Sequence, residues 1–419
     1  MAMQEFQYIQ DILKEFYAPA IVNQVYKKAP FWAQVQKRDK GIYGKRVVIP
    51  IQTAFTEAVG ARTANNYALP AASRNTYDQA YIYIKRNYGR IQVDGFAIES
   101  AKNKGGWVDI VTAETKGVSS AFAMDLDRQS MGNGLGILGN YVSGQGTTSI
   151  VVNDAGGIAG DTPATKWFRV GMVLDSYNFG TTYAHLDDGV TVTAITPATN
   201  TITLSAAGNA GLVDDGDGFV REDARAFGAA PTDANTGEIM GLDGIIDSAD
   251  VLAAWDFEGI DRAANECWQA YKDTTAQVLS EEVIQNALDA IETRTDAESP
   301  NLILTTYALR NKLISLVKAD RMITQMDLKA GWKAIKYIGG NVELPVMVHK
   351  NCPVGYMYFI SLPHITFYTL KNLVWDDKGG GVVKPVAGFD AYEAWFKMYG
   401  NLGTDCCNAH GKLTGLTTS

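Results

Sequence analysis

Two segments of alternating hydrophobic residues lie on either side of a long connection of mostly small and polar residues. The first segment covers residues 44–51 and the second covers residues 77–86. Large side chains alternate in the second segment, at Tyr81, Ile82, Tyr83 and Ile84. A period of two predicts β-strands whose successive side chains point to opposite faces. The pair of segments therefore predicts one extended β-hairpin within residues 44–95.

This predicted hairpin has too little chain around it to form a core of its own. A two-stranded ribbon is marginal in water unless something packs on it, and a connection of this length is typical of a functional loop. We therefore expect a second copy of the chain to cover the ribbon. The candidate subunit-interface residues are Val47, Ile49, Ile51, Tyr81, Ile82, Tyr83 and Ile84, together with Phe31 and Trp32.

Helical periodicity predicts three further segments before the last third of the chain. Residues 4–28 carry an amphipathic pattern, typical of an N-terminal arm that is ordered only when docked. Residues 107–131 predict a single helix of about 40 Å, which suits a structural strut. Residues 257–275 also have a helical pattern.

The composition changes near residue 140, where Gly, Thr, Asp and Ala become frequent and Lys becomes rare. Residues 190–204 contain two alternating segments around a turn, which predicts a hairpin. Further strands are expected at residues 149–152 and 168–173. Residues 140–230 therefore predict a separate all-β unit, either a small sandwich or a barrel.

Helices and strands alternate in the last third of the chain. Ser280 is placed to cap a helix, and a second helix is expected to bury Leu309 and Leu313. The buried face of the first helix is expected to carry Ile284, Ala287, Leu288 and Ile291. Strands are expected at residues 302–304, 334–338, 344–348, 356–360, 365–370 and 391–399. This alternation predicts a sheet flanked by helices.

The formal net charge is −9 and the sequence pI is about 5.1. These values exclude a protein that reads nucleic acid through an overall basic surface, and an acidic wall would contain DNA rather than grip it. One basic strip is the exception, with Lys27, Lys28, Lys37, Arg38, Lys40, Lys45 and Arg46. Two interpretations of the strip stay open, namely contact with nucleic acid and contact with an acidic surface on a neighbouring subunit.

The four cysteines lack the spacing of a zinc site, so we expect free and mostly buried thiols in a reducing compartment. No secretory signal and no membrane-spanning stretch is predicted.

Motifs that carry chemistry are weak. Residues 134–139 match GxGxxG, but a dinucleotide site needs a strand before this motif and a helix after it, and here the order is reversed. Residues 213–218 lack the third carboxylate and the final Glu of a calcium loop. The four histidines form no HExxH or paired motif, and there is no GxSxG elbow. We predict no catalytic residue, no cofactor and no metal site.

The order of these pieces resembles the major capsid protein of tailed bacteriophages, which has the Hong Kong 97-like shell fold. The residues that carry the resemblance are Gln24–Trp32, Gly44–Ile51, Tyr88–Gly95 and the helix ending at Gly132-Asn133-Gly134. The resemblance implies an α+β fold with an inserted all-β domain. The implied parts are an N-terminal arm (1–43), an extended β-hairpin loop (44–95), a peripheral domain with a spine helix (96–139), the inserted β-rich domain (140–230), a second peripheral part (231–274), an axial α/β domain (275–382) and a C-terminal return to the peripheral domain (383–419).

The resemblance also implies a function. The expected protein is structural rather than enzymatic, and it assembles with itself into hexamers and pentamers of an icosahedral virion head around double-stranded DNA. The implied partners are a portal, a separate scaffolding protein and, where one is used, a decoration protein; no membrane is involved. Assembly is expected in the host cytoplasm. Two alternatives stay open: an encapsulin-type nanocompartment shell, and an α/β enzyme that uses residues 275–370 with the β-rich unit as a lid.

Overall fold

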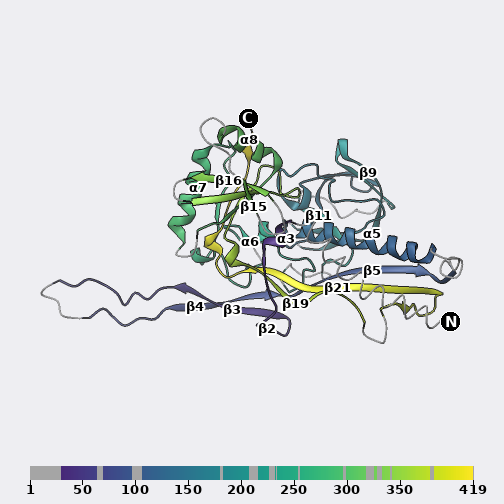
Figure 1. Ribbon diagram of the computed structural model, residues 1–419, viewed down its shortest axis with the longest axis horizontal. Helices are drawn as coiled ribbons and strands as arrows, with labels where there is room; N and C mark the ends of the chain where they lie inside the picture. The colour runs from purple at the N-terminus through teal and green to yellow at the C-terminus, as the bar shows by residue number, and fades with distance from the viewer. Residues whose placement is uncertain are drawn as a thin grey trace.

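The computed structural model describes residues 30–63, 69–96, 106–179, 183–206, 216–225, 232, 234–252, 255–295, 299–317, 325–327, 333–339, 342–377 and 382–418. Its shape is elongated: a two-stranded ribbon projects from one end, and a long helix lies beside paired strands at the other (Figure 1). The amphipathic pattern predicted at residues 4–28 lies outside the described residues.

A five-stranded sheet, here called the long sheet, runs through the elongated body. Its strands are β1 (Gln36–Arg38), β5 (Lys85–Asp94), β19 (Ile365–Trp375), β20 (Lys384–Pro385) and β21 (Ala391–Thr404). Helix α5 (Gly106–Gln129) lies along this sheet (Figure 1), which confirms the long helix predicted at residues 107–131. Phe122 on α5 meets Phe396 on β21 edge to face, with ring centroids 5.0 Å apart. Gly89 on β5 leaves room for the Phe396 ring, because a Cβ there would overlap it.

The last third of the chain forms a second, seven-stranded sheet. Its strands, in spatial order, are β12 (Tyr271–Asp273), β22 (Gly411–Leu413), β18 (Met357–Ile360), β14 (Leu302–Thr305), β17 (Val342–Val348), β16 (Lys333–Gly339) and β15 (Gln325–Asp327). Strand β21 of the long sheet ends at Thr404, and β22 lies inside the seven-stranded sheet, so the last residues of the chain contribute to both sheets.

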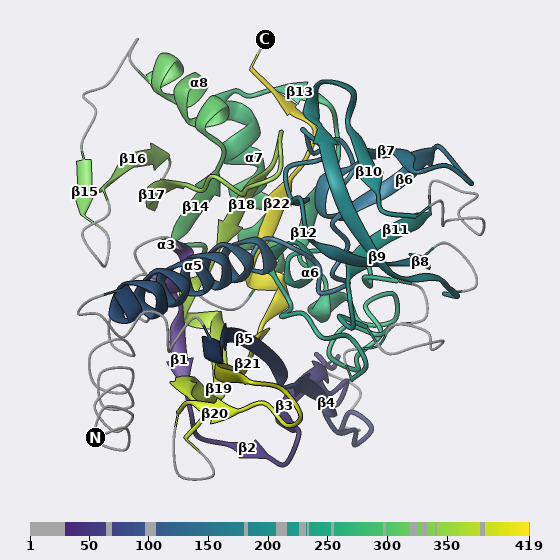
Figure 2. The ribbon, with the colours of Figure 1, turned by 90° about the vertical axis from the view of Figure 1, so that its right-hand side faces the viewer.

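Two helices share a hydrophobic core with one face of the seven-stranded sheet (Figure 2): α7 (Glu281–Arg294) and α8 (Tyr307–Val317). The Ser280 hydroxyl caps α7 by accepting a hydrogen bond of 3.3 Å from the Val283 N–H, as predicted. The predicted buried residues of these helices are buried, namely Ile284, Ala287, Leu288, Ile291, Leu309 and Leu313. The other face of the sheet contributes Leu304 and Tyr358 to the main core, which also contains the inner residues of the long sheet.

Six strands close into a barrel, seen beside the seven-stranded sheet in Figure 2. They are β6 (Gly139–Ser143), β7 (Ser149–Asn153), β8 (Val173–Asn178), β9 (His185–Thr196), β10 (Thr201–Leu204) and β11 (Asp217–Arg221). The pairing of β9 with β10 confirms the hairpin predicted at residues 190–204. Closure gives each strand two neighbours, so the barrel presents no open sheet edge.

Two predicted elements are wrong. Residues 257–275 do not form a helix but turns, the 3₁₀ segment Glu266–Trp268 and strand β12. The reason is tertiary: side chains take carbonyl groups of this segment, because Trp268 Nε1 donates to Phe257, the Gln269 amide to Arg262 and the Arg262 guanidinium to Trp268. The strand expected at residues 168–173 begins only at Val173, because residues 164–171 form turns.

The remaining elements are short. They are α3 (Pro30–Gln34), β2 (Ile42–Tyr43), β3 (Arg46–Ala54), β4 (Thr76–Tyr83), α6 (Leu242–Ile245), β13 (Gln277–Val278) and β23 (Leu416–Thr417), with 3₁₀ segments at Ala155–Gly157, Pro197–Thr199, Leu362–His364 and Cys407–Ala409.

Candidate assembly interface

Strands β3 and β4 form the projecting ribbon, and they confirm the predicted hairpin. Their antiparallel register runs from Arg46 opposite Tyr83, at the root, to Ala54 opposite Thr76, at the outer end. Figure 1 shows that the outer end of the ribbon leads away from the body, whereas β3 stays in contact with it as far as Thr53, whose carbonyl accepts from Cys267 Sγ at 3.7 Å. At about 3.3 Å per residue, β3 alone extends roughly 30 Å.

The root of the ribbon is held by its own chain. Val47 and Ile82 are 4% and 0% exposed, and they form a small cluster with Tyr368 of the long sheet. The Tyr81 N–H donates to the Glu258 carbonyl at 2.6 Å, and the Asn401 side-chain amide donates to the Tyr83 carbonyl at 2.9 Å. Val47 and Ile82 are therefore wrongly predicted as interface residues, because their side chains have no surface left for a second copy.

The other predicted residues of the root are partly covered. Ile49, Ile51 and Ile84 are half-buried against clusters of the same chain. Tyr81 and Tyr83 are also half-buried, and the Arg46 guanidinium lies 4.1 Å above the Tyr81 ring. A role for these five side chains between subunits stays a prediction.

Phe31 and Trp32 are core residues rather than interface residues. Phe31 is 0% exposed, and Trp32 packs edge to face on Phe367 with ring centroids 4.9 Å apart. The Trp32 indole N–H donates to the Leu126 carbonyl of α5 at 3.2 Å. The prediction is wrong for these two residues because α3 places them between α5 and the long sheet.

The outer half of the ribbon carries the large exposed hydrophobic residues that sequence reasoning missed. Their exposed fractions are 75% for Phe55, 82% for Val59, 88% for Leu69 and 64% for Tyr77. They lie in or beside the connection between the two strands, where the surrounding small and polar residues give no hydrophobic pattern that would have marked them. One signal in the sequence could have identified them: they are large apolar residues in a stretch that was not predicted to pack against any core. Four such side chains on a projecting ribbon form a surface that typically marks a protein interface.

A second exposed apolar site lies at the opposite end of the molecule. Phe96 and Phe389 are each 74% exposed, and the adjacent residues Gly95 and Asp390 are joined by a backbone hydrogen bond of 2.8 Å. The two ends of the elongated body thus carry different apolar surfaces.

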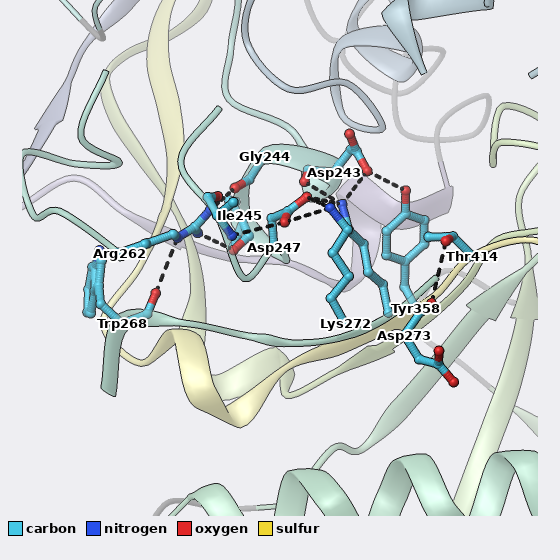
Figure 3. Close-up of polar contacts among 12 residues, drawn as sticks. Asp243, Gly244, Ile245, Asp247, Arg262, Trp268, Lys272, Asp273, Tyr358 and Thr414 are labelled. Atoms are coloured by element: carbon cyan, nitrogen blue, oxygen red, sulfur yellow. Dashed lines mark hydrogen bonds and ion pairs between the residues drawn. The ribbon is translucent and has the colours of Figure 1, made fainter. Parts of the chain in front are cut away.

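The segment that follows the barrel contacts both the ribbon, through Glu258 and Tyr81, and the seven-stranded sheet, through Asp243 and Lys412. Figure 3 shows the polar contacts of this junction. Arg262 is fully buried, and its guanidinium donates to the carbonyl groups of Gly244 (2.9 Å), Ile245 (2.7 Å), Ala249 (2.9 Å) and Trp268 (3.2 Å). It also lies 3.9 Å above the Phe257 ring. One cation thereby satisfies four carbonyl groups that no helix or strand pairs.

Buried ion pairs reinforce the same junction. The Lys412 ammonium lies 2.6 Å from Asp243 and 2.7 Å from Asp247, and Lys272 lies 2.9 Å from Asp247. Burial alone would raise the pKa of Asp247, but the two lysines hold that pKa below its usual value. These pairs join strands β12 and β22 to the segment that follows the barrel.

A separate buried network joins α5 to the seven-stranded sheet. The Asp127 carboxylate accepts from His349 Nε2 at 2.9 Å and from the Asn351 side-chain amide at 2.7 Å. Because His349 Nδ1 accepts the Asn351 backbone N–H at 3.2 Å, the ring proton lies on Nε2. His349 is thus a structural residue.

The motifs with possible chemistry have structural roles. Gly134 and Gly136 both have φ +79°, which glycine adopts without strain, and they lead the chain from α5 into the barrel. In the segment that partly matches a calcium loop, Asp217 is buried and accepts a hydrogen bond from Asn178 at 2.7 Å, while 213–215 lie outside the described residues.

Two groups of described side chains are spaced closely enough to hold a metal ion, with ligand atoms within 4.8 Å of one another. They are Asp175, His185 and Asp188, and Asp250, Asp256 and Asp261. The central carboxylate of each group already orders the backbone: Asp175 accepts from Gly189 (3.1 Å) and Asp223 (2.9 Å), and Asp250 accepts from Phe257 (2.9 Å) and Arg262 (3.3 Å).

The cysteines fit the prediction of free thiols. All four are free, with Cys352 and Cys407 buried and Cys267 and Cys406 half-buried. Burial raises the pKa of the Cys352 and Cys407 thiols, which makes both poor nucleophiles. Among the described residues, no helix is both long enough and apolar enough to cross a bilayer.

The comparisons with known proteins give a likeness at the level of structure. No family model and no curated protein matches the sequence. The capsid asymmetric unit of cyanophage A-1(L) aligns with 12% identity over 93% of each chain, at a TM-score of 0.49. The capsid of a native GTA particle aligns with 8% identity over 93% of this chain and 91% of that chain, at a TM-score of 0.46.

An encapsulin complex from Synechococcus elongatus aligns with 6% identity over 93% of this chain and 88% of that chain, at a TM-score of 0.42. At TM-scores below 0.5 these likenesses decide nothing about function by themselves, and phage and encapsulin shells both appear among them. Along 93% of its length, the chain is similar in structure to a protein of a phage capsid.

Proposed function

We propose that this chain is the shell-forming subunit of a phage capsid. One observation carries the proposal: the outer half of the ribbon exposes Phe55, Val59, Leu69 and Tyr77 beyond the reach of its own body. An identical neighbouring chain is the partner that each copy always has available. The ribbon of one copy and the surface that receives it on the next are different, so the contact is heterologous, and such contacts form a ring when the rotation between copies closes.

The magnitudes favour collective assembly over a tight dimer. Burying one large apolar side chain is worth about 1.5–3 kcal/mol, so the four outer residues supply roughly 6–12 kcal/mol before costs. Association itself costs about 4–15 kcal/mol. A single ribbon contact is therefore marginal, whereas contacts repeated around rings and between rings stabilise a closed shell.

In this proposal the rings are the hexamers and pentamers of an icosahedral head, located in the virion. The head encloses double-stranded DNA without reading its sequence, which fits a chain with net charge −9. A portal, a separate scaffolding protein and a decoration protein are the further partners proposed. The long helix α5 serves as the spine of the peripheral domain, the barrel is an inserted domain, and the chain has no catalytic role.

The test replaces Val59 and Leu69 by Asp, since both are exposed and neither supports the fold. The double variant Val59→Asp, Leu69→Asp should yield folded, soluble chains and no closed particles in electron micrographs. A matched control, Val170→Asp with Val278→Asp, places two acidic residues at exposed valines away from the ribbon and should still assemble. Intact particles from the ribbon variant would contradict the proposal.

The second candidate is an encapsulin-type shell, which the similarity to an encapsulin complex keeps open. The content of purified particles separates the two candidates. DNA inside them supports a phage head, and a protein cargo without DNA supports an encapsulin. The third alternative, an enzyme with a β lid, predicts a monomer with substrate turnover and no particles.

A further inference from the structure

The basic strip predicted from the sequence becomes part of a larger basic patch in the fold. Strand β1 pairs with β19, β19 pairs with β21, and β21 pairs with β5, so Arg38, Lys371 and Arg86 come together near the ribbon root. The Ile84 N–H donates to the Lys45 carbonyl at 3.0 Å, which places Lys45 at the same root. The basic patch comprises Lys37, Arg38, Lys40, Lys45, Arg46, Arg86 and Lys371.

These cations lie at the surface of an otherwise acidic protein. Most of the patch is exposed, while Arg46 and Lys371 are half-buried. Asp39 is the carboxylate within the strip. Two further carboxylates, those of Glu258 and Asp405, lie near Tyr368 at the ribbon root. Glu258 is 3% exposed, whereas Asp405 is exposed, so Asp39 and Asp405 offset two of the seven positive charges of the patch.

The complementary surface is on the barrel. Residues 139–225 contain ten Asp or Glu and four Lys or Arg, a net charge of −6 out of −9 for the chain. Several of these carboxylates gather where β8, β9 and β11 meet, because Asp175 accepts the N–H groups of Gly189 and Asp223. The acidic end, as we name this surface, comprises Asp187, Asp188, Glu222 and Asp223, of which the last three are exposed.

The two surfaces lie on opposite sides of one chain. The barrel is tied to α5 by an ion pair of 3.1 Å between Arg221 and Asp125, and α5 covers one face of the long sheet. Successive residues of a strand point to opposite faces. Phe367 faces the α5 side, where Trp32 lies, so Tyr368 and the ribbon root that packs on it occupy the other face. The acidic end therefore has to meet a basic patch on another copy.

We propose that the acidic end of the barrel in one copy binds the basic patch at the ribbon root of the next copy. The inference rests on the proposed shell function and adds a second contact to it, one that fixes which neighbour each ribbon meets. Opposite charges across an interface steer encounter and suppress wrong pairings more than they add affinity. Nucleic acid is the rival occupant of the patch. The chain supplies its own acidic partner, and its net charge opposes a polyanion, so a second copy is favoured.

A charge exchange tests the contact. Lys40→Glu with Arg86→Glu reverses two charges of the basic patch, and Asp188→Lys with Glu222→Lys reverses two charges of the acidic end. Each double variant should lower the fraction of chain that sediments as particles by more than about tenfold. The four-residue variant carries both changes, places opposite charges at the exchanged positions again and should return the particle yield to within about threefold of the wild type.

The control Lys116→Glu with Arg169→Glu makes the same charge change at two exposed sites outside both surfaces and should assemble normally. A four-residue variant that stays unassembled while the wild type forms particles overturns this inference alone. Wild-type chain that sediments only as a monomer overturns the proposed function as well. Loss of co-purifying nucleic acid from the basic-patch variant, with no defect in the acidic-end variant, assigns the patch to nucleic acid and overturns the inference.

Discussion

Ile82 on β4 packs directly against Gly403 on β21, and its Cδ1 atom occupies the space that a Cβ on Gly403 would need. This contact joins the ribbon root to the long sheet, since Ile82 is fully buried there beside Val47 and Tyr368. The ribbon is consequently anchored at one end by its own chain, and only its outer half remains for a partner.

Adding a methyl group at Gly403 should weaken this anchor. The variant Gly403→Ala forces Ile82 away from β21 and should lower the free energy of unfolding by about 1–3 kcal/mol. Urea unfolding of the unassembled Val59→Asp, Leu69→Asp background measures the loss without interference from particles. The matched control is Gly117→Ala on α5, where a Cβ meets nothing within 4 Å and should add about 0.5–1 kcal/mol. Equal stability of the two glycine variants would refute the anchoring role.

Replacing Arg262 by Lys should show that the junction needs the guanidinium and not merely a positive charge. A lysine ammonium has three donors on a flexible stem and leaves buried carbonyl groups of Gly244, Ile245 or Trp268 without a partner. We expect Arg262→Lys to cost about 2–4 kcal/mol in urea unfolding. Arg310→Lys, on the surface of α8, serves as the comparison and should change stability by less than about 0.5 kcal/mol. An Arg262→Lys chain as stable as the wild type would mean that the junction tolerates unpaired carbonyls.

His410 should make the fold sensitive to acid. Complete burial and, to a smaller extent, the nearby His364 lower the pKa of His410 to about 3 from an ordinary value of 6.5. The folded protein therefore binds fewer protons here than the unfolded chain does. The stabilising contribution of neutral His410 is full above pH 6.5 and is lost progressively as the pH falls toward 3.

The structural cause can be measured at one amide. The Ser361 N–H donates to His410 Nδ1 at 3.1 Å, and protonation of that nitrogen breaks the bond. Hydrogen exchange of the Ser361 amide should accelerate as the pH is lowered through this window, relative to the intrinsic rate at each pH. The variant His410→Gln should flatten the dependence of unfolding free energy on pH between 6.5 and 3, whereas His364→Gln, at the more exposed neighbour, should leave most of it. A pH profile unchanged by His410→Gln would show that other groups control acid stability.

Local patterns predicted the elements of this protein well. The alternation around Tyr81 and Ile82, the capping position of Ser280 and the long helical period after residue 106 are each properties of a few neighbouring residues, and each element is present. Residues 257–275 are the instructive exception. Their helical period is real, but the carbonyl groups of Phe257, Arg262 and Trp268 accept hydrogen bonds from side chains instead.

The candidate interface was harder to predict, because exposure depends on residues that are distant in sequence. Phe31 and Trp32 have the composition of an interface yet lie between α5 and the long sheet, whereas Phe55, Val59 and Leu69 stand in a stretch of small residues and remain open. Nothing in the local pattern distinguishes these two sets.

The sequence alone determined that the protein forms a long ribbon, a strut-like helix, a β-rich unit and a helix-flanked sheet. The reason is that each backbone conformation has its own period of side-chain direction along the chain. Tertiary structure decided which side chains of the ribbon are free. Ile82 is buried against β21 of the same chain, whereas the residues of the outer ribbon lie too far from β21 to pack on it. The outer ribbon is therefore the part that a neighbouring copy can contact.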